Sequence, residues 1–104
     1  MKFLTESQAI RILEILPNST QARLISRGGN YGIPASDLLR KMPNNLLDNP
    51  ADIENFLNIK DISHEDPISK GGSPNDFDNW NFEDSQINRL RGANQVTFEE
   101  KIYA

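Results

Sequence analysis

Cysteine is absent from this sequence of 104 residues, and histidine and tryptophan occur once each. The absence of cysteine excludes disulfides, thiolate zinc sites and cysteine nucleophiles, and it is typical of a reducing compartment. An uninterrupted apolar run of about 18 residues is also missing, because Glu, Ser, Gln and Arg interrupt the apolar residues of segment 1–16. We therefore expect a soluble, cytoplasmic protein that has no membrane partner.

Basic residues are outnumbered, with 11 Lys and Arg against 15 Asp and Glu, for a net charge of −4. If this excess of acidic residues were spread evenly along the chain, it would argue against a nucleic-acid partner, because Lys and Arg dominate phosphate binding. The charge is uneven, however: residues 1–47 carry six basic and three acidic side chains, whereas residues 48–84 carry two and ten. Acid is concentrated around the single histidine, which favours a divalent cation there.

Short helices are predicted in the first half of the chain. The first begins with a capping box formed by Thr5 and Gln8 and ends at Pro17. Its expected core-facing residues are Ala9, Ile10, Ile12, Leu13 and Leu16.

A second helix is predicted over 19–29, and its exposed side would carry Arg23 and Arg27 four residues apart. We interpret this pair either as a grip on DNA phosphates or as an ordinary solvated helix face. Another short helix is expected to present Arg40 and Lys41 as further basic residues, and a last one is expected to begin at Asn49.

Residues 58–92 predict a strand, a long loop, a second strand and a helix. The first strand begins at Ile59 and delivers His64, and the alternation of apolar and polar residues in 80–82 indicates the second strand. Asp84 or Ser85 would cap the helix. The small core expected here consists of Trp80, Phe82, Ile87 and Leu90.

Four elements of this stretch agree in order and spacing. His64 is followed by PISKGG at 67–72, by Asn79 fifteen positions after the histidine within DFDN, and by Asn88 nine further on within NRLRG. Together they resemble the HNH endonuclease motif in its His-Asn-Asn form. The first two phrases are similar to DNase-type bacterial toxins, and the last is similar to phage HNH proteins. The resemblance covers about thirty residues.

The resemblance implies an α+β fold in which N-terminal short helices pack on a C-terminal ββα-metal motif. The expected organisation is a single domain, 1–104, with a helical part at 1–57, the HNH-like motif at 58–92 and an extension at 93–104. Residues 95–103 are compatible with either a strand or a helix. The implied source is a bacterium or a phage-infected host.

The resemblance also implies roles for individual residues. His64 would be the general base that activates water, Asn79 would hold the loop and orient His64, and Asn88 would bind the metal. Imidazole has an ordinary pKa of about 6.5, which suits a base at cellular pH. Mg²⁺, with Mn²⁺ as the alternative, would use oxygen ligands. The implied activity is hydrolysis of phosphodiester bonds in DNA, with a protein partner as one source of sequence specificity.

One position departs from the family pattern. Ser63 stands where HNH proteins usually have an Asp or His metal ligand. Residues two apart on a strand share a face, so Asp61 or Glu65 could replace it, and we favour Asp61.

The remaining basic residues suit the DNA backbone: Arg89 and Arg91 beside the proposed metal, and Arg23 and Arg27 on the second helix. The alternative interpretation is that the metal site has decayed. The fold would then serve as a non-catalytic module that binds a protein partner through its acidic face.

Overall fold

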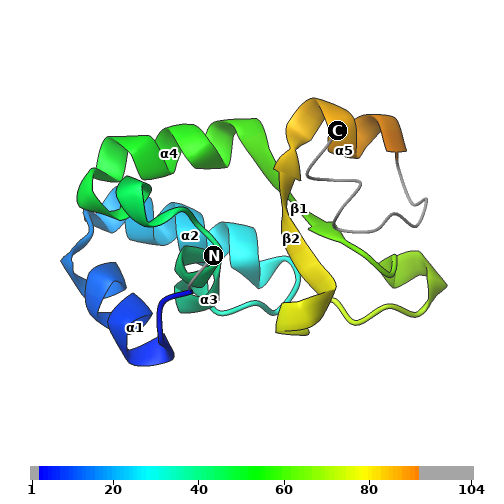
Figure 1. Cartoon of the computed structure of the whole chain (residues 1–104), viewed down its shortest axis with the longest axis horizontal. Helices are drawn as coiled ribbons and strands as arrows, with labels where there is room; N and C mark the ends of the chain where they lie inside the picture. Colours follow the sequence, from blue (N-terminus) through cyan, green and yellow to red (C-terminus); the bar gives the residue numbers. More distant parts are fainter. Residues whose placement is uncertain (1–2, 92–104) are drawn as a thin grey trace. The chain divides into compact units, whose positions relative to one another are not determined.

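The computed structural model describes residues 3–91, and the chain divides after Phe56 into two units (Figure 1). We call the first the helical unit and the second the hairpin–helix unit. Within the described residues, none of the helices has the length and apolar character needed to cross a membrane. The helical unit contains α1 (Glu6–Ile15), α2 (Asn18–Gly29), α3 (Ala35–Arg40), the 3₁₀ turn η1 (Asn44–Asp48) and most of α4 (Pro50–Ile59).

Helix α1 begins with the predicted capping box. The Thr5 hydroxyl accepts a hydrogen bond from the Gln8 amide at 3.2 Å, and the Gln8 side chain accepts one from the Thr5 amide at 2.9 Å. The expected inward position of Ile10 is wrong, because Ile10 is 41% exposed while Ala9 is fully buried. The buried row starts at Ala9 and continues to Leu16, and Ile10 lies about 100° away from it around the helix.

The core of the helical unit is formed where α1 and α2 pack against α3. Its fully buried residues each contribute roughly 1.5–3 kcal/mol through removal of apolar surface from water. They include Leu24, Leu38, Leu39, Met42 and Ile53.

The end of α2 depends on a close backbone approach. The amide of Ile33 donates to the carbonyl of Gly28 at 2.9 Å. A Cβ atom on Gly28 would overlap the carbonyl of Ile33, whereas a Cβ atom on Gly29 would meet nothing within 4 Å. Packing therefore requires glycine at position 28, whereas neither space nor backbone conformation requires it at position 29.

The hairpin–helix unit contains β1 (Lys60–His64), the 3₁₀ turns η2 (Ile68–Lys70) and η3 (Phe77–Asn79), β2 (Trp80–Asp84) and α5 (Ser85–Arg91). The two strands are antiparallel and α5 packs on both. This confirms an α+β fold in which N-terminal helices are followed by an antiparallel hairpin and a short helix. The predicted strand start was one residue early, because α4 runs to Ile59 and β1 follows without a loop.

The strand register sorts side chains onto two faces. His64 lies opposite Trp80, and Ile62 lies opposite Phe82, so these four residues share one face. Trp80 is fully buried and makes edge-to-face contacts with Phe82 at 5.9 Å and with Phe77 at 5.8 Å between ring centroids. The inclusion of Leu90 in this core was wrong, since its side chain is 88% exposed.

Of the two predicted caps of helix α5, Asp84 and Ser85, the structure uses Asp84. The Asp84 carboxylate accepts hydrogen bonds from the amides of Gln86 at 3.0 Å and Ile87 at 3.3 Å. These bonds satisfy two of the amides that a helix start leaves without an intrahelical acceptor. The predicted stop at Gly92 and the segment 95–103 lie outside the described residues.

The two glycines at the end of α2 give a matched test of this packing. Gly28→Ala is expected to lower the free energy of unfolding by about 1–3 kcal/mol, because its methyl group has no space. Gly29→Ala is expected to be neutral or to raise it by up to about 1 kcal/mol, because alanine restricts the unfolded chain. Urea denaturation measures both, and equal effects would contradict the close approach to Ile33.

Candidate active site

His64 is half-buried at the end of β1 and its ring contacts the connecting loop. Its Nε2 atom lies 2.7 Å from the carbonyl oxygen of Pro74. A carbonyl oxygen can only accept a hydrogen bond, so Nε2 carries the hydrogen in the neutral ring. The ring lone pair, which is the basic position, is therefore on Nδ1.

Asn79 ties the two ends of the loop together. Its Oδ1 accepts a hydrogen bond from the amide of Asp66 at 2.9 Å, and its Nδ2 donates to the carbonyls of Asp66 at 3.2 Å and Ser73 at 2.7 Å. The Asn79 carbonyl also accepts from the amide of Glu65 at 2.9 Å. These bonds are of the loop-holding kind that the predicted role requires.

The influence of Asn79 on His64 is indirect. Asn79 binds the carbonyl of Ser73, and the next carbonyl, that of Pro74, binds the His64 ring. Asn79 therefore fixes the peptide segment that positions His64, and its amide group does not bind the imidazole itself.

The PISKGG segment, residues 67–72, folds into a tight turn next to Asp66, which Asn79 binds. The amides of Lys70 and Gly72 both donate to the carbonyl of Pro67 at 2.9 Å. Gly71 has φ +93°, in the left-handed region where other residues are strained. A Cβ atom on Gly72 would overlap the carbonyl of Asp66, whose hydrogen bond to Asn79 would then be disturbed.

A second group of predicted residues gathers around Asp61, where β1 faces α5. The Asp61 carboxylate accepts a hydrogen bond from Ser85 Oγ at 3.0 Å and another from Asn88 Nδ2 at 3.4 Å. Arg89 Nε lies 3.7 Å from Asp61 Oδ2. We call these four residues the Asp61 cluster.

Sequence reasoning treated Ser85 only as a cap and missed its bond to Asp61. The signal was available in the helical spacing, because Ser85, Asn88 and Arg89 are three and four residues apart and share one face of a helix. The partner on β1 was not visible in the same way, since it lies 24 residues earlier in the chain.

The candidate catalytic and metal-binding residues form two separate groups, one around His64 and Asn79 and the other around Asp61. Strand alternation directs Asp61 and Ser63 to the face that α5 covers and His64 to the opposite face. Three residues of strand span about 10 Å, so the Cα atoms of Asp61 and His64 are separated by about this distance. Ser63, which lies between these two residues in the chain, is buried. Glu65 donates a hydrogen bond from its backbone amide to the carbonyl of Asn79.

The Asp61 cluster suits a hard divalent cation better than zinc. Across residues 3–91 no three His, Asp or Glu side chains come close enough together to hold a metal ion. Asp61 and Asn88 nevertheless bring a carboxylate and an amide group to one place, with the amide nitrogen Nδ2 toward the carboxylate. Mg²⁺ commonly takes one or two protein oxygens together with waters and substrate phosphates. Arg89 is the competing charge in this cluster.

The predicted DNA-binding arginines differ in their surroundings. Arg23 and Arg27 are half-buried on α2, and Arg23 Nη1 donates to the carbonyl of Glu54 at 3.4 Å. Arg89 is largely exposed, with 76% of its side chain accessible. Arg91 is the last residue of α5, and its side chain lies outside the described part of the chain.

Arg40 and Lys41, expected as further basic residues of the candidate DNA-binding surface, both have contacts within the helical unit, and Lys41 is buried. Arg40 Nε donates to the carbonyl of Leu4 at 3.1 Å, and its Nη1 lies 3.4 Å from the Asp37 carboxylate. Lys41 is only 8% exposed. Packing within the helical unit occupies both residues.

Comparison with known proteins yields no match to a family model, a curated protein or a solved structure. The HNH resemblance therefore stays a prediction that rests on the motif residues themselves. Its residues have nonetheless been located within a hairpin followed by a helix.

The role of Asn79 in closing the loop can be measured directly. Asn79→Ala is expected to lower the free energy of unfolding by about 1–2 kcal/mol and to speed hydrogen exchange at the Asp66 amide, which loses its acceptor. Asn75→Ala removes one exposed bond to Ser73 in the same loop, and a change within about 0.5 kcal/mol is expected. A similar loss in both variants would show that Asn79 has no special role.

Proposed function

We propose that this protein is a metal-dependent endonuclease of the HNH type that hydrolyses phosphodiester bonds in DNA. The observation that supports this most is the order of the motif residues on the hairpin and helix. His64 ends β1, Asn79 closes the loop just before β2, and Asn88 on α5 lies beside Asp61. This is the order of residues along a strand, a loop and a helix that the resemblance implies.

His64 acts as the general base through Nδ1. A water molecule loses a proton to Nδ1 as its oxygen attacks the phosphorus, the bond from phosphorus to the leaving sugar oxygen breaks, and that oxygen gains a proton from solvent. The ring then carries positive charge, and the hydrogen bond from Nε2 to the Pro74 carbonyl stabilises it. No covalent enzyme intermediate is needed.

Asp61 and Asn88 are the residues that would hold the cation. Asn88 would use Oδ1, which requires its amide group to turn and Nδ2 to give up its hydrogen bond to Asp61. A divalent cation supplies, when bound, neutralisation of the charge that develops on the phosphate and the leaving oxygen. Ser85 orients the Asp61 carboxylate through its 3.0 Å hydrogen bond. Such outer-shell bonds fix the direction of a ligand and are part of most metal sites.

Arg89 fits a phosphate-binding role in the same cluster. Its single contact with Asp61 is 3.7 Å long and the side chain is 76% exposed, so the ion pair contributes little stability. The guanidinium can leave Asp61 and donate to phosphate oxygens, which it matches in geometry.

The placement of His64 and Asp61 on opposite faces of β1 is compatible with in-line displacement. In that reaction the attacking and leaving oxygens lie on opposite sides of the phosphorus. In this structure the reaction requires the phosphate to lie at the edge of the hairpin, where side chains from both faces of β1 would have to reach it.

One observation favours the alternative, a non-catalytic module that binds a protein partner. The Asp61 carboxylate already has Ser85, Asn88 and Arg89 as partners within the described residues. Arg89 already balances the negative charge of Asp61, so this cluster does not require a cation. In this case the exposed acidic residues of the loop, Asp66, Asp76 and Asp78, would face the partner.

Nicking of supercoiled plasmid with Mg²⁺ or Mn²⁺ tests the proposal. The wild-type protein is expected to cut, and His64→Ala is expected to reduce the rate by about 100-fold or more, because the proton acceptor is lost. Asp61→Asn is expected to lose both cutting and Mn²⁺ binding measured by calorimetry.

Asp78→Asn is the matched control, since it removes the same charge from an exposed loop position. It should retain both properties. Cutting that persists in His64→Ala would overturn the assignment of the base. Failure of the wild type to cut, together with no heat of Mn²⁺ binding, would favour the non-catalytic module.

A further inference from the structure

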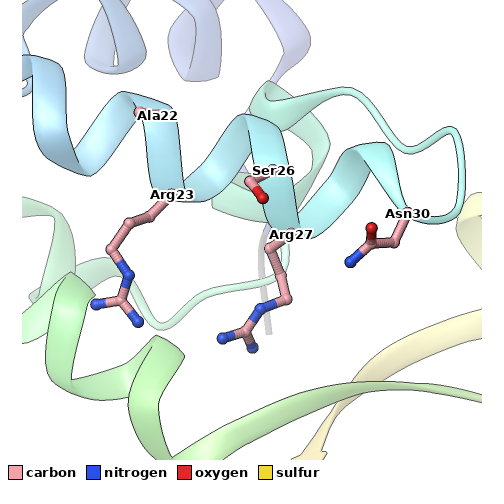
Figure 2. Close-up of a pocket in the computed structure, with 5 residues that line it drawn as sticks. All are labelled: Ala22, Arg23, Ser26, Arg27 and Asn30. Carbon is pink, nitrogen blue, oxygen red and sulfur yellow. The ribbon is translucent and has the colours of Figure 1, made fainter.

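A hollow of about 300 Å³ lies along one side of α2 in the helical unit (Figure 2). All five residues that line it belong to one stretch of the helical unit. They are Ala22, Arg23, Ser26, Arg27 and Asn30.

The polar residues of this hollow are all able to donate hydrogen bonds. Arg23 and Arg27 are four residues apart, and Figure 2 shows both side chains extending from the same side of α2, with Asn30 next along the helix. Ser26 adds a hydroxyl group. The lining contains two positive charges and no carboxylate, so it selects an anion.

A backbone carbonyl on α4 is one of the groups that hold Arg23 in position. Arg23 Nη1 donates to the backbone carbonyl of Glu54 on α4 at 3.4 Å. The carboxylate of the same residue accepts a hydrogen bond from Thr20 Oγ1 at 3.2 Å. The hydrogen bond to the Glu54 carbonyl restrains the guanidinium of Arg23, which lowers the conformational entropy that ligand binding must still remove.

We propose that this hollow, the α2 phosphate site, binds phosphate groups of the DNA backbone. Guanidinium groups donate two parallel hydrogen bonds to phosphate oxygens, and hydroxyl and amide groups add single ones. Residues four apart on a helix are separated by about 6 Å along its axis, which suits an extended polyanion. The inference rests on the proposed function for its choice of DNA, but the site lies on different residues.

Duplex binding without metal tests the site separately from catalysis. Fluorescence anisotropy of a labelled DNA duplex in EDTA measures affinity across a range of salt concentrations. Arg27→Gln is expected to weaken binding several-fold and to reduce the slope of log K against log salt by about 1, because one phosphate contact is lost. Ser26→Asp, at an exposed position, is expected to weaken binding at least as much.

Arg11→Gln is the matched control, because Arg11 is an exposed arginine on α1 outside the hollow and its loss changes the net charge equally. A loss of affinity in Arg11→Gln equal to that in Arg27→Gln would overturn the inference, since it would reflect net charge alone. Inorganic phosphate at millimolar concentration should not displace the duplex at constant ionic strength. Full displacement would assign the hollow to a small free anion and also overturn it.

The plasmid assay separates this inference from the proposed function. If all α2 variants bind DNA like the wild type while plasmid nicking remains dependent on His64, the α2 phosphate site is wrong and the endonuclease stands. If Arg27→Gln weakens duplex binding while the wild type fails to nick, the endonuclease is wrong and a DNA-binding helical unit remains.

Discussion

The side chain of Asn79 is the contact on which the hairpin–helix unit depends. The fifteen residues from 65 to 79 separate the end of β1 from the start of β2, and closing such a loop costs conformational entropy. Asn79 offsets this cost by accepting from Asp66 and donating to Asp66 and Ser73. The same bonds fix Pro74 against His64 and maintain the strand register that brings Asp61 under α5.

Charge balance at Asp61 connects the fold with the proposed chemistry. In the structure Arg89 neutralises this carboxylate at 3.7 Å, and a cation would have to compete with it. A DNA phosphate offers Arg89 a better partner, because guanidinium and phosphate match in geometry and charge. If the proposed cation and DNA both bind, each is expected to favour the other, because DNA would draw Arg89 away from Asp61.

Local features of the chain were predictable, and features set by tertiary packing were not. The capping box at Thr5 and the cap at Asp84 follow from residues that lie within three positions of one another. Sequence reasoning misplaced Ile10 and Lys41 because the exposed side of a helix depends on the elements that cover it. The bond from Arg23 to the carbonyl of Glu54 joins positions 31 residues apart and leaves no local pattern.

The most direct test of a cation at the Asp61 cluster is paramagnetic broadening by Mn²⁺ in amide NMR spectra. At substoichiometric Mn²⁺ the account predicts selective loss of the signals of residues around Asp61, Ser63 and Asn88, and recovery of those signals in Asp61→Asn. Broadening centred on the exposed loop acids Asp76 and Asp78, and unchanged in Asp61→Asn, would contradict it.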